Sequence, residues 1–298
     1  MNNQMFRNVA ELVELAESQG KKISEVMIEA EMEVSQRSRD AIMQDMYANL
    51  DVMEKAVRRG LTEDIRSHSG LTGGDAKKLQ TYMETKTFLS GPTLLNAVSM
   101  SVAVNEVNAA MGTIVATPTA GACGIVPGTL FAVSDKLQPT REEMVNYLFT
   151  AGAIGYCIAN NAFISGAAGG CQAEVGSATA MAAAAIVEMA GGTPEESAQA
   201  VAIALKNMLG LVCDPVAGLV EVPCVKRNAM GAAIATVAAD MAMAGIKSVI
   251  PTDEVIDAMY RIGCAMPTTL KETAQGGLAA TQTGRMIEAK VFGVRMEK

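Results

Sequence analysis

CQAEVGSATAMAAAAIVEMA, residues 171–190, is the stretch that decides the fold. Almost every residue in it is small or apolar, with no polar face at helical spacing. A helix that is apolar on all sides is buried, and small side chains let neighbouring helices approach closely. Glu188 interrupts the run, so we expect an internal helix of a water-soluble protein rather than a membrane span.

The rest of the chain has the same character. Of its 298 residues 50% are hydrophobic, but only 4% are aromatic, and 21 are Met, which fills gaps between helices. Only residues 113–117 and 249–250 form β-branched runs, and both are short. The sequence therefore predicts an all-α fold, a bundle of Ala/Val/Met-rich buried helices joined by small-residue loops. Helices are expected at about 92–112, 141–162, 172–190, 195–209, 227–244 and 253–264, with starts marked by Pro92, Thr140, Pro194 and Thr252.

The N-terminal part is more polar. Helical spacing predicts one helix over residues 5–20 and a long charged helix from Ser24 to about Arg59. We therefore divide the chain into an N-terminal helical arm, residues 1–60, and an all-α main domain, residues 61–298, in which we expect the functional site.

The net charge of −8 bears on partners and location. An acidic chain with a pI near 4.9 lacks the basic patch that nucleic acids require. The N-terminus has no basic region followed by an apolar one, so it does not look like a signal peptide. The apolar stretch 228–250 is interrupted by Asp240. We expect a cytoplasmic protein with no nucleic-acid or membrane partner.

Three of the six cysteines occupy comparable positions. Cys171, Cys213 and Cys224 all fall next to Gly or Pro near predicted helix ends. Ligands there can converge without breaking helical hydrogen bonds. The spacing is not that of a zinc finger, and no nearby His completes a tetrahedral site. Three thiolates without a fourth ligand suit a [4Fe–4S] cluster with one open iron that acts as a Lewis acid. Inert buried cysteines are the alternative.

The other cysteines are harder to assign. Cys157 and Cys264 are expected in the core, and Cys123 is either close to substrate or a small filler in a glycine loop. A fourth thiol near the first three would favour a closed, structural cluster in a non-catalytic subunit.

Several strings together carry a resemblance. They are SHSGLTGGD (67–75), PTAGACGIVPG (118–128), GGCQAEVGSA (169–178), CDPVAGLVEVPC (213–224) and MPTTLKETAQGGLA (266–279). In this order they resemble the alpha subunit of the iron–sulfur-dependent bacterial L-serine dehydratases, over roughly residues 60–285. The resemblance implies a catalytic subunit that converts L-serine to pyruvate and ammonia, with a [4Fe–4S] cluster on Cys171, Cys213 and Cys224. A related iron–sulfur lyase acting on cysteine or another β-substituted amino acid is the nearest enzymatic alternative.

The resemblance also implies a partner. The complete enzymes pair this part with a beta subunit that carries a Ser-Ser-His-Thr type motif, which is absent from this sequence. Some relatives fuse both parts and end in a cysteine tail. This chain ends in residues 294–298, VRMEK, without such a cysteine, so we expect the two-chain type.

His68 is the only histidine and the candidate catalytic residue. It serves as a base or a carboxylate ligand, or it is a surface loop histidine, and a beta-subunit histidine competes for the base role. The flanking Ser67 and Ser69 are candidate substrate contacts.

Further substrate contacts are predicted in two loops and at one helix end. Thr119, Ala120 and Gly121 can offer backbone N–H groups to the serine carboxylate, or form an ordinary tight turn. Lys271 either pairs with that carboxylate or is solvated, and Asn161 either touches substrate or caps its helix.

Overall fold

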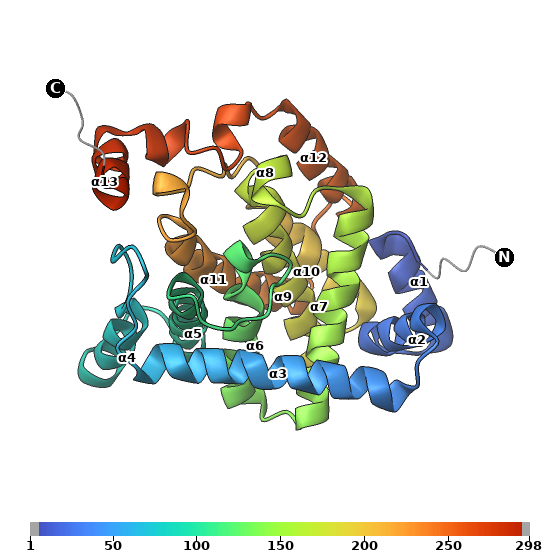
Figure 1. Cartoon of the computed structure of the whole chain (residues 1–298). Coiled ribbons are helices and arrows are strands. Elements are labelled where there is room, and N and C mark those ends of the chain that lie inside the picture. Colours follow the sequence, from blue (N-terminus) through green and yellow to red (C-terminus); the bar gives the residue numbers. More distant parts are fainter. Residues whose placement is uncertain (1–5, 294–298) are drawn as a thin grey trace.

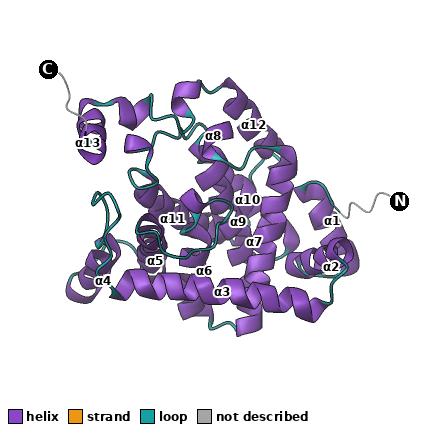
Figure 2. Ribbon diagram, viewed as in Figure 1, coloured by secondary structure: helices purple, strands orange, loops and turns teal. Residues whose placement is uncertain are grey.

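The all-α prediction is confirmed. A computed structural model describes residues 6–293, and this part of the chain contains thirteen α-helices and no strand. Figure 2 shows helices joined by loops throughout. The helices are α1 Val9–Gln19, α2 Ile23–Ser35, α3 Arg39–Thr62, α4 Asp75–Thr85, α5 Pro92–Ala109, α6 Ile125–Leu137, α7 Arg141–Asn161, α8 Gly166–Gly169, α9 Ser177–Met189, α10 Pro194–Lys206, α11 Cys224–Met243, α12 Thr252–Ala265 and α13 Gln282–Phe292.

Helix α9 is the centre of the bundle. It packs against α6, α7, α10 and α11, which surround it in Figure 1. All residues from Ala182 to Ala185 are fully buried, as expected for a helix that is apolar on every side. Its one acid, Glu188, is buried but satisfied, because it accepts hydrogen bonds from the Ser24 N–H (3.2 Å) and the Thr150 hydroxyl (2.7 Å).

Most predicted helix starts are confirmed, and one is wrong. Pro92 and Pro194 are first-turn residues, and Thr140 forms a capping box with Glu143. Thr252 does not cap α12. It is the first helical residue, and its hydroxyl donates to the Ala198 carbonyl instead (2.8 Å).

The predicted long helix over residues 24–59 is also wrong. The chain breaks it into α2 and α3 at Gln36, which adopts a left-handed conformation with φ 55°. Ser38 then caps α3 by accepting from the Ala41 N–H (3.3 Å). Helices α4, α6, α8 and α13 were not predicted.

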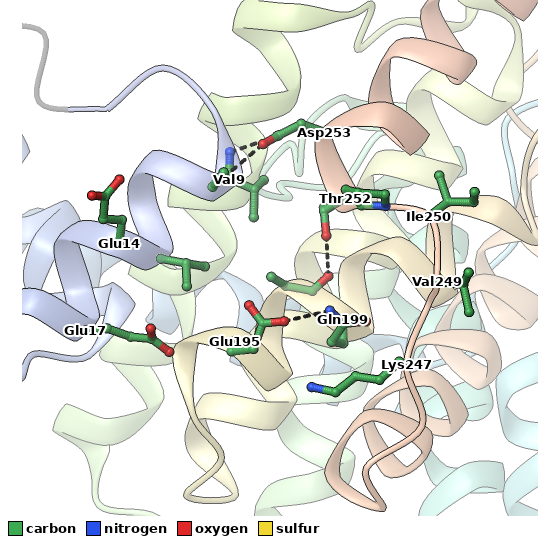
Figure 3. A pocket seen from close by; sticks show the side chains of 14 residues that line it. Val9, Glu14, Glu17, Glu195, Gln199, Lys247, Val249, Ile250, Thr252 and Asp253 are labelled. Atoms are coloured by element: carbon green, nitrogen blue, oxygen red, sulfur yellow. Dashed lines mark hydrogen bonds between the residues drawn. The ribbon is translucent and has the colours of Figure 1, made fainter.

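The N-terminal helices join the same hydrophobic cluster as the rest of the bundle, to which they contribute Leu12, Ile28 and Leu50. The start of α1 is held by Asp253 of α12, whose carboxylate accepts from the N–H groups of Val9 and Ala10 (2.9 and 3.0 Å). These contacts border a cleft of 510 Å³ between α1, α10 and the segment before α12 (Figure 3). Among residues 6–293, no helix is both long and apolar enough to cross a membrane.

Candidate active site

Cys171 begins a short π-helical turn, Gln172–Gly176, which leads into α9. π-Helical turns are rare in proteins, but those that occur are often located at functional sites. Gly170 precedes it with φ 79°, and a Cβ there would lie 2.5 Å from the Met266 sulfur, so only glycine fits. The Gln172 N–H donates to the Leu211 carbonyl (2.9 Å), which attaches this turn to the segment that carries Cys213.

Cys213 lies beside the segment that follows α12. Its N–H donates to the Leu270 carbonyl (2.8 Å), and its carbonyl accepts from the Glu272 N–H (2.7 Å). These two bonds form an isolated parallel bridge between Cys213 and Lys271. The bridge brings the sequence segments 213–218 (CDPVAG) and 268–272 (TTLKE) side by side, although they are far apart in the sequence.

Cys224 is the first residue of α11 and is fixed by Asn228 one turn later. The Asn228 amide donates to the carbonyls of Cys224 (3.0 Å) and Gly121 (2.7 Å). Its oxygen accepts from the Gly124 N–H (3.2 Å). The side chain is fully buried, so this single amide ties the loop after Pro118 to the third cysteine.

The structure brings the three predicted cysteines together. Their exposed fractions are 3%, 5% and 8% for Cys171, Cys213 and Cys224. A hydrogen bond from the Cys213 thiol, together with the positive charge of Arg227, lowers the pKa of Cys171. The same hydrogen bond and burial raise the pKa of Cys213. Burial, and then the negative charge of Cys171, raise the pKa of Cys224 to about 12. Each thiol therefore lies within electrostatic reach of Cys171.

Arg227, also in the first turn of α11, lies at the centre of this arrangement. Its guanidinium donates to the Val212 carbonyl (2.7 Å) and pairs with Asp214 (2.8 Å). Asp214 also accepts from the Leu278 N–H (2.6 Å). Arg227 thus fixes the segment around Cys213 and places a cation beside the Cys171 sulfur.

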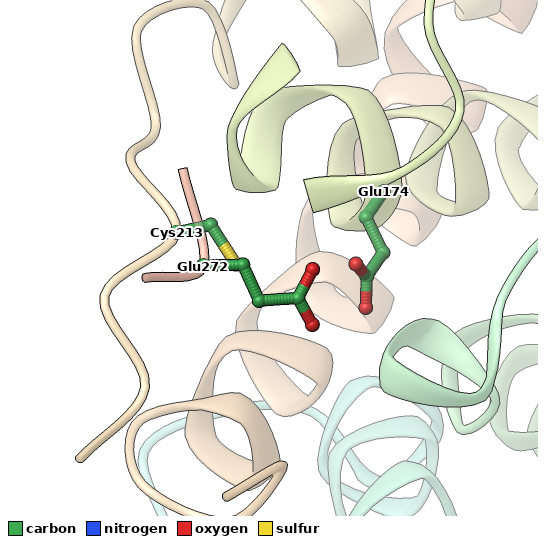
Figure 4. Close-up of side chains that lie close together, drawn as sticks. All are labelled: Glu174, Cys213 and Glu272. Atoms are coloured by element: carbon green, nitrogen blue, oxygen red, sulfur yellow. The ribbon is translucent and has the colours of Figure 1, made fainter. Parts of the chain in front are cut away.

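Two carboxylates complete the site. Figure 4 shows the carboxylates of Glu174 and Glu272 facing each other beside Cys213. One oxygen from each and the Cys213 sulfur lie within 4.8 Å of one another. Glu174 accepts from the Gly166 N–H (3.1 Å). Burial, and then the charge of Glu272, raise the pKa of Glu174.

His68 lies in an exposed loop that is attached to the cysteine segment by Glu221. The Glu221 carboxylate is 5% exposed and accepts from the hydroxyls of Ser69 (2.8 Å) and Thr72 (2.9 Å). Ser67 is buried, and its hydroxyl accepts from the Thr72 N–H (3.1 Å). His68 itself lines a cleft of 550 Å³ between this loop and α13.

Ala120 and Gly121 form the start of a 3-10 turn beside Glu174. Their N–H groups donate to no acceptor in the described part of the chain. The hydroxyl oxygen of Thr119 is buried beside the Glu174 carboxylate. A side chain at position 121 would collide with the Glu174 carboxylate, so the backbone of this loop borders the site directly.

Asn161 and Lys271 differ in their relation to the site. The Asn161 amide donates to the carbonyls of Cys157 (2.8 Å) and Arg7 (2.7 Å), which is the helix-end role that was the alternative to substrate contact. Lys271 lies in the bridge with Cys213 and is half-buried.

The remaining cysteines lie in other surroundings. Cys157 is buried in the main core as predicted, and Cys123 packs into an apolar cluster with Val57 and Val104. Cys264 was predicted to be in the core, and this is wrong. It is exposed on α12, where it contacts the Tyr260 hydroxyl. The expectation that the chain lacks a cysteine tail concerns residues 294–298, which lie outside the residues that the structure describes.

Sequence reasoning missed Glu174, Glu272, Glu221, Arg227 and Asn228. A signal was present for two of them. Glu174 is an acid in an otherwise small and apolar stretch, and Arg227 follows Cys224 by three residues, which places it on the same side of α11. The others act through contacts between distant segments.

Comparisons with known proteins agree on one family. Residues 18–279 match the family model described as serine dehydratase alpha chain. The chain is 69% identical over 289 residues to the probable L-serine dehydratase, alpha chain, of Bacillus subtilis (strain 168), covering 97% of this chain and 96% of the relative. It is 42% identical over 283 residues to the L-serine dehydratase, alpha chain, of Peptoniphilus asaccharolyticus (95% and 97%). It is 37% identical over 280 residues to the L-serine dehydratase TdcG of Escherichia coli (strain K12), covering 92% of this chain but 61% of that protein.

Proposed function

The chain belongs to the serine dehydratase alpha chain family, and from this premise we propose that it is the catalytic part of an L-serine dehydratase that forms pyruvate and ammonia. The observation that carries the proposal is the convergence of Cys171, Cys213 and Cys224 at one buried place, within the matched residues. The names of the relatives supply the substrate.

We propose that these three cysteines hold a [4Fe–4S] cluster. The donor set fits, since the three thiols are buried, Cys213 and Cys224 both interact with Cys171, and the Arg227 cation beside Cys171 offsets part of the thiolate charge. Cys264 lies on the surface and Cys123 packs in a separate apolar cluster, which supports a three-thiolate site. When bound, a cluster with one iron free of protein thiolate supplies a Lewis acid that makes hydroxide a tolerable leaving group at neutral pH.

The loop after Pro118 is proposed to bind the serine carboxylate. The N–H groups of Ala120 and Gly121 have no acceptor in the described chain, and an anion is the ligand that such a pair favours. Asn228 holds this loop against the start of α11, so the loop and Cys224 keep a fixed relation. Lys271, next to Cys213, is a further proposed carboxylate contact.

His68 is proposed to move the α-proton of serine. It lines a solvent-open cleft, and its loop is fixed to the cysteine segment through Glu221. Ser67 and Ser69 belong to that hydrogen-bonded loop, and we propose Ser69 as its substrate contact, since Ser67 is buried. The competing hypothesis places the base on a beta chain.

A beta chain is the proposed partner. Two of the relatives are named alpha chains, and the chain spans only 61% of TdcG, so that protein contains a substantial part that this chain lacks. A separate second chain that supplies this part is the arrangement that the names support.

The proposal is tested with the chain and its beta chain, co-purified without oxygen and reconstituted with iron and sulfide. We expect pyruvate from L-serine, little product from L-cysteine, and loss of activity in air that iron and a thiol restore. Full activity of an iron-free sample would contradict the proposal. His68→Ala tests the base, because unchanged turnover would remove His68 from the mechanism.

A further inference from the structure

Two like charges face each other in the site without a counterion. The oxygens of Glu174 and Glu272 lie within 4.8 Å, one on the π-helical turn after Cys171 and the other on the segment bridged to Cys213 (Figure 4). Glu174 is only 8% exposed whereas Glu272 is exposed, so solvent reaches the pair mainly from the side of Glu272.

No cation of the described chain neutralises them. Neither carboxylate forms an ion pair with a lysine or arginine among residues 6–293, and the nearest arginine in the site, Arg227, is engaged by Asp214 and the Val212 carbonyl. Glu174 accepts a hydrogen bond from the Gly166 N–H and otherwise has only the Thr119 hydroxyl beside it. A buried carboxylate with so few partners is costly unless a positively charged ligand completes its surroundings.

The surrounding backbone approaches the pair closely. Gly166 faces the pair, and a Cβ there would lie 3.0 Å from the Glu174 carboxylate and 2.6 Å from the Cys213 sulfur. The Thr119 hydroxyl lies beside Glu174, and its interaction with that carboxylate lowers the pKa of Glu174. Glu272 has φ 62°, a conformation that a non-glycine residue adopts at some cost, which indicates that its position is maintained by its surroundings.

We propose that Glu174 and Glu272 bind the α-ammonium group of the amino-acid substrate and thereby select amino acids over hydroxy acids. An ammonium group has three N–H donors, and the two carboxylates with the Thr119 hydroxyl offer three acceptors. Gly121, a proposed donor to the substrate carboxylate, borders Glu174. The acceptors for the ammonium group therefore lie next to the donors for the carboxylate. This arrangement matches an α-amino acid, in which both groups are attached to the same carbon. This inference rests on the proposed function.

The test compares ligands that differ only in the ammonium group. In the first pair, the KM of L-serine is compared with the inhibition constant of 3-hydroxypropionate. In the second pair, the affinities of L-alanine and propionate are measured by titration calorimetry on the anaerobic two-chain complex. Glu272→Gln is the main variant, because Glu272 is exposed and the substitution preserves its size. Glu174→Gln is the second variant, and it keeps an acceptor for the Gly166 N–H. Glu14→Gln, a carboxylate that lines the cleft beside α1, is the matched control.

We expect each site variant to weaken the binding of L-serine and L-alanine about tenfold or more, which corresponds to the loss of one charge-assisted hydrogen bond. The binding of 3-hydroxypropionate and propionate is expected to be unchanged or tighter. Iron content is expected to remain that of the unsubstituted protein. Equal weakening of both members of a pair would overturn the inference.

Two further outcomes are informative. Tight binding of Fe²⁺ or Co²⁺ alone to the cluster-free chain, lost in Glu272→Gln while ligand discrimination persists, would overturn the inference in favour of a cation site. The calorimetric pair also separates this inference from the proposed function. A complex that releases no pyruvate from L-serine contradicts the function, whereas preference for L-alanine over propionate, abolished in Glu272→Gln, still supports ammonium recognition.

Discussion

Asn228→Ala is expected to destabilise the chain more than its small change in volume suggests. The amide donates to the carbonyls of Gly121 and Cys224 and accepts from the Gly124 N–H, all in the protein interior. Alanine leaves the Gly121 carbonyl and the Gly124 N–H without their side-chain partner. Each of these two unsatisfied buried groups costs about 1–3 kcal/mol, so we expect the free energy of unfolding to fall by about 2–6 kcal/mol.

The assay is urea unfolding followed by circular dichroism, on chain prepared without iron so that metal release does not contribute. Asn207→Ala is the matched control. Asn207 is exposed directly after α10, and its amide makes one bond, to the Ile203 carbonyl (2.8 Å). Its loss is expected to cost less than about 1 kcal/mol. If the two variants unfold within about 0.5 kcal/mol of each other, Asn228 does not fix the loop after Pro118.

Three other substitutions test separate parts of the account. Glu221→Ala removes two hydrogen bonds to a buried charge and is expected to speed amide exchange of Ser67 and Thr72 at least tenfold, whereas unchanged exchange would show that the His68 loop is held by other contacts. Gly166→Ala places a methyl group against the Cys213 sulfur and is expected to lower iron bound per chain by more than half, while normal iron loading would show that the site has more room than the structure describes. Arg39 lowers the pKa of Glu25, so this pair stabilises the chain above the unfolded pKa of about 4.3 and the gain is lost as the pH falls through the lower native pKa. Both side chains are about one-third exposed, so Glu25→Gln should reduce stability by less than about 1 kcal/mol at neutral pH and by nothing at about pH 2, and a loss that persists in acid would contradict this assignment.

Local sequence signals predicted the helices of the bundle well. The alanine-rich stretch that becomes α9, the prolines that start α5 and α10, and the capping box of Thr140 act within a few residues, so they can be read without the fold. The break at Gln36 could not be predicted, because a left-handed glutamine has no sequence signature.

The site was only partly predictable, because some of its residues are brought in by contacts between segments that are far apart in the sequence. The positions of the three cysteines near Gly and Pro suggested a metal site, and the family resemblance assigned the cluster to them. Glu221 and Glu272 reach the site through contacts with segments far away in the sequence, namely the His68 loop and the bridge at Cys213. Cys264 looked like a core residue because it lies in an apolar stretch, but it falls on the outer face of α12.

The most direct test of the central claim is the iron and acid-labile sulfide content of single cysteine variants, reconstituted without oxygen. Cys171→Ser, Cys213→Ser and Cys224→Ser are each expected to bind much less than the unsubstituted chain, which should approach about four iron and four sulfide per chain. Cys264→Ser, which replaces an exposed thiol outside the site, is expected to bind as much as the unsubstituted chain. Full iron and sulfide in any of the first three variants, or equal loss in Cys264→Ser, would contradict a cluster held by these three cysteines.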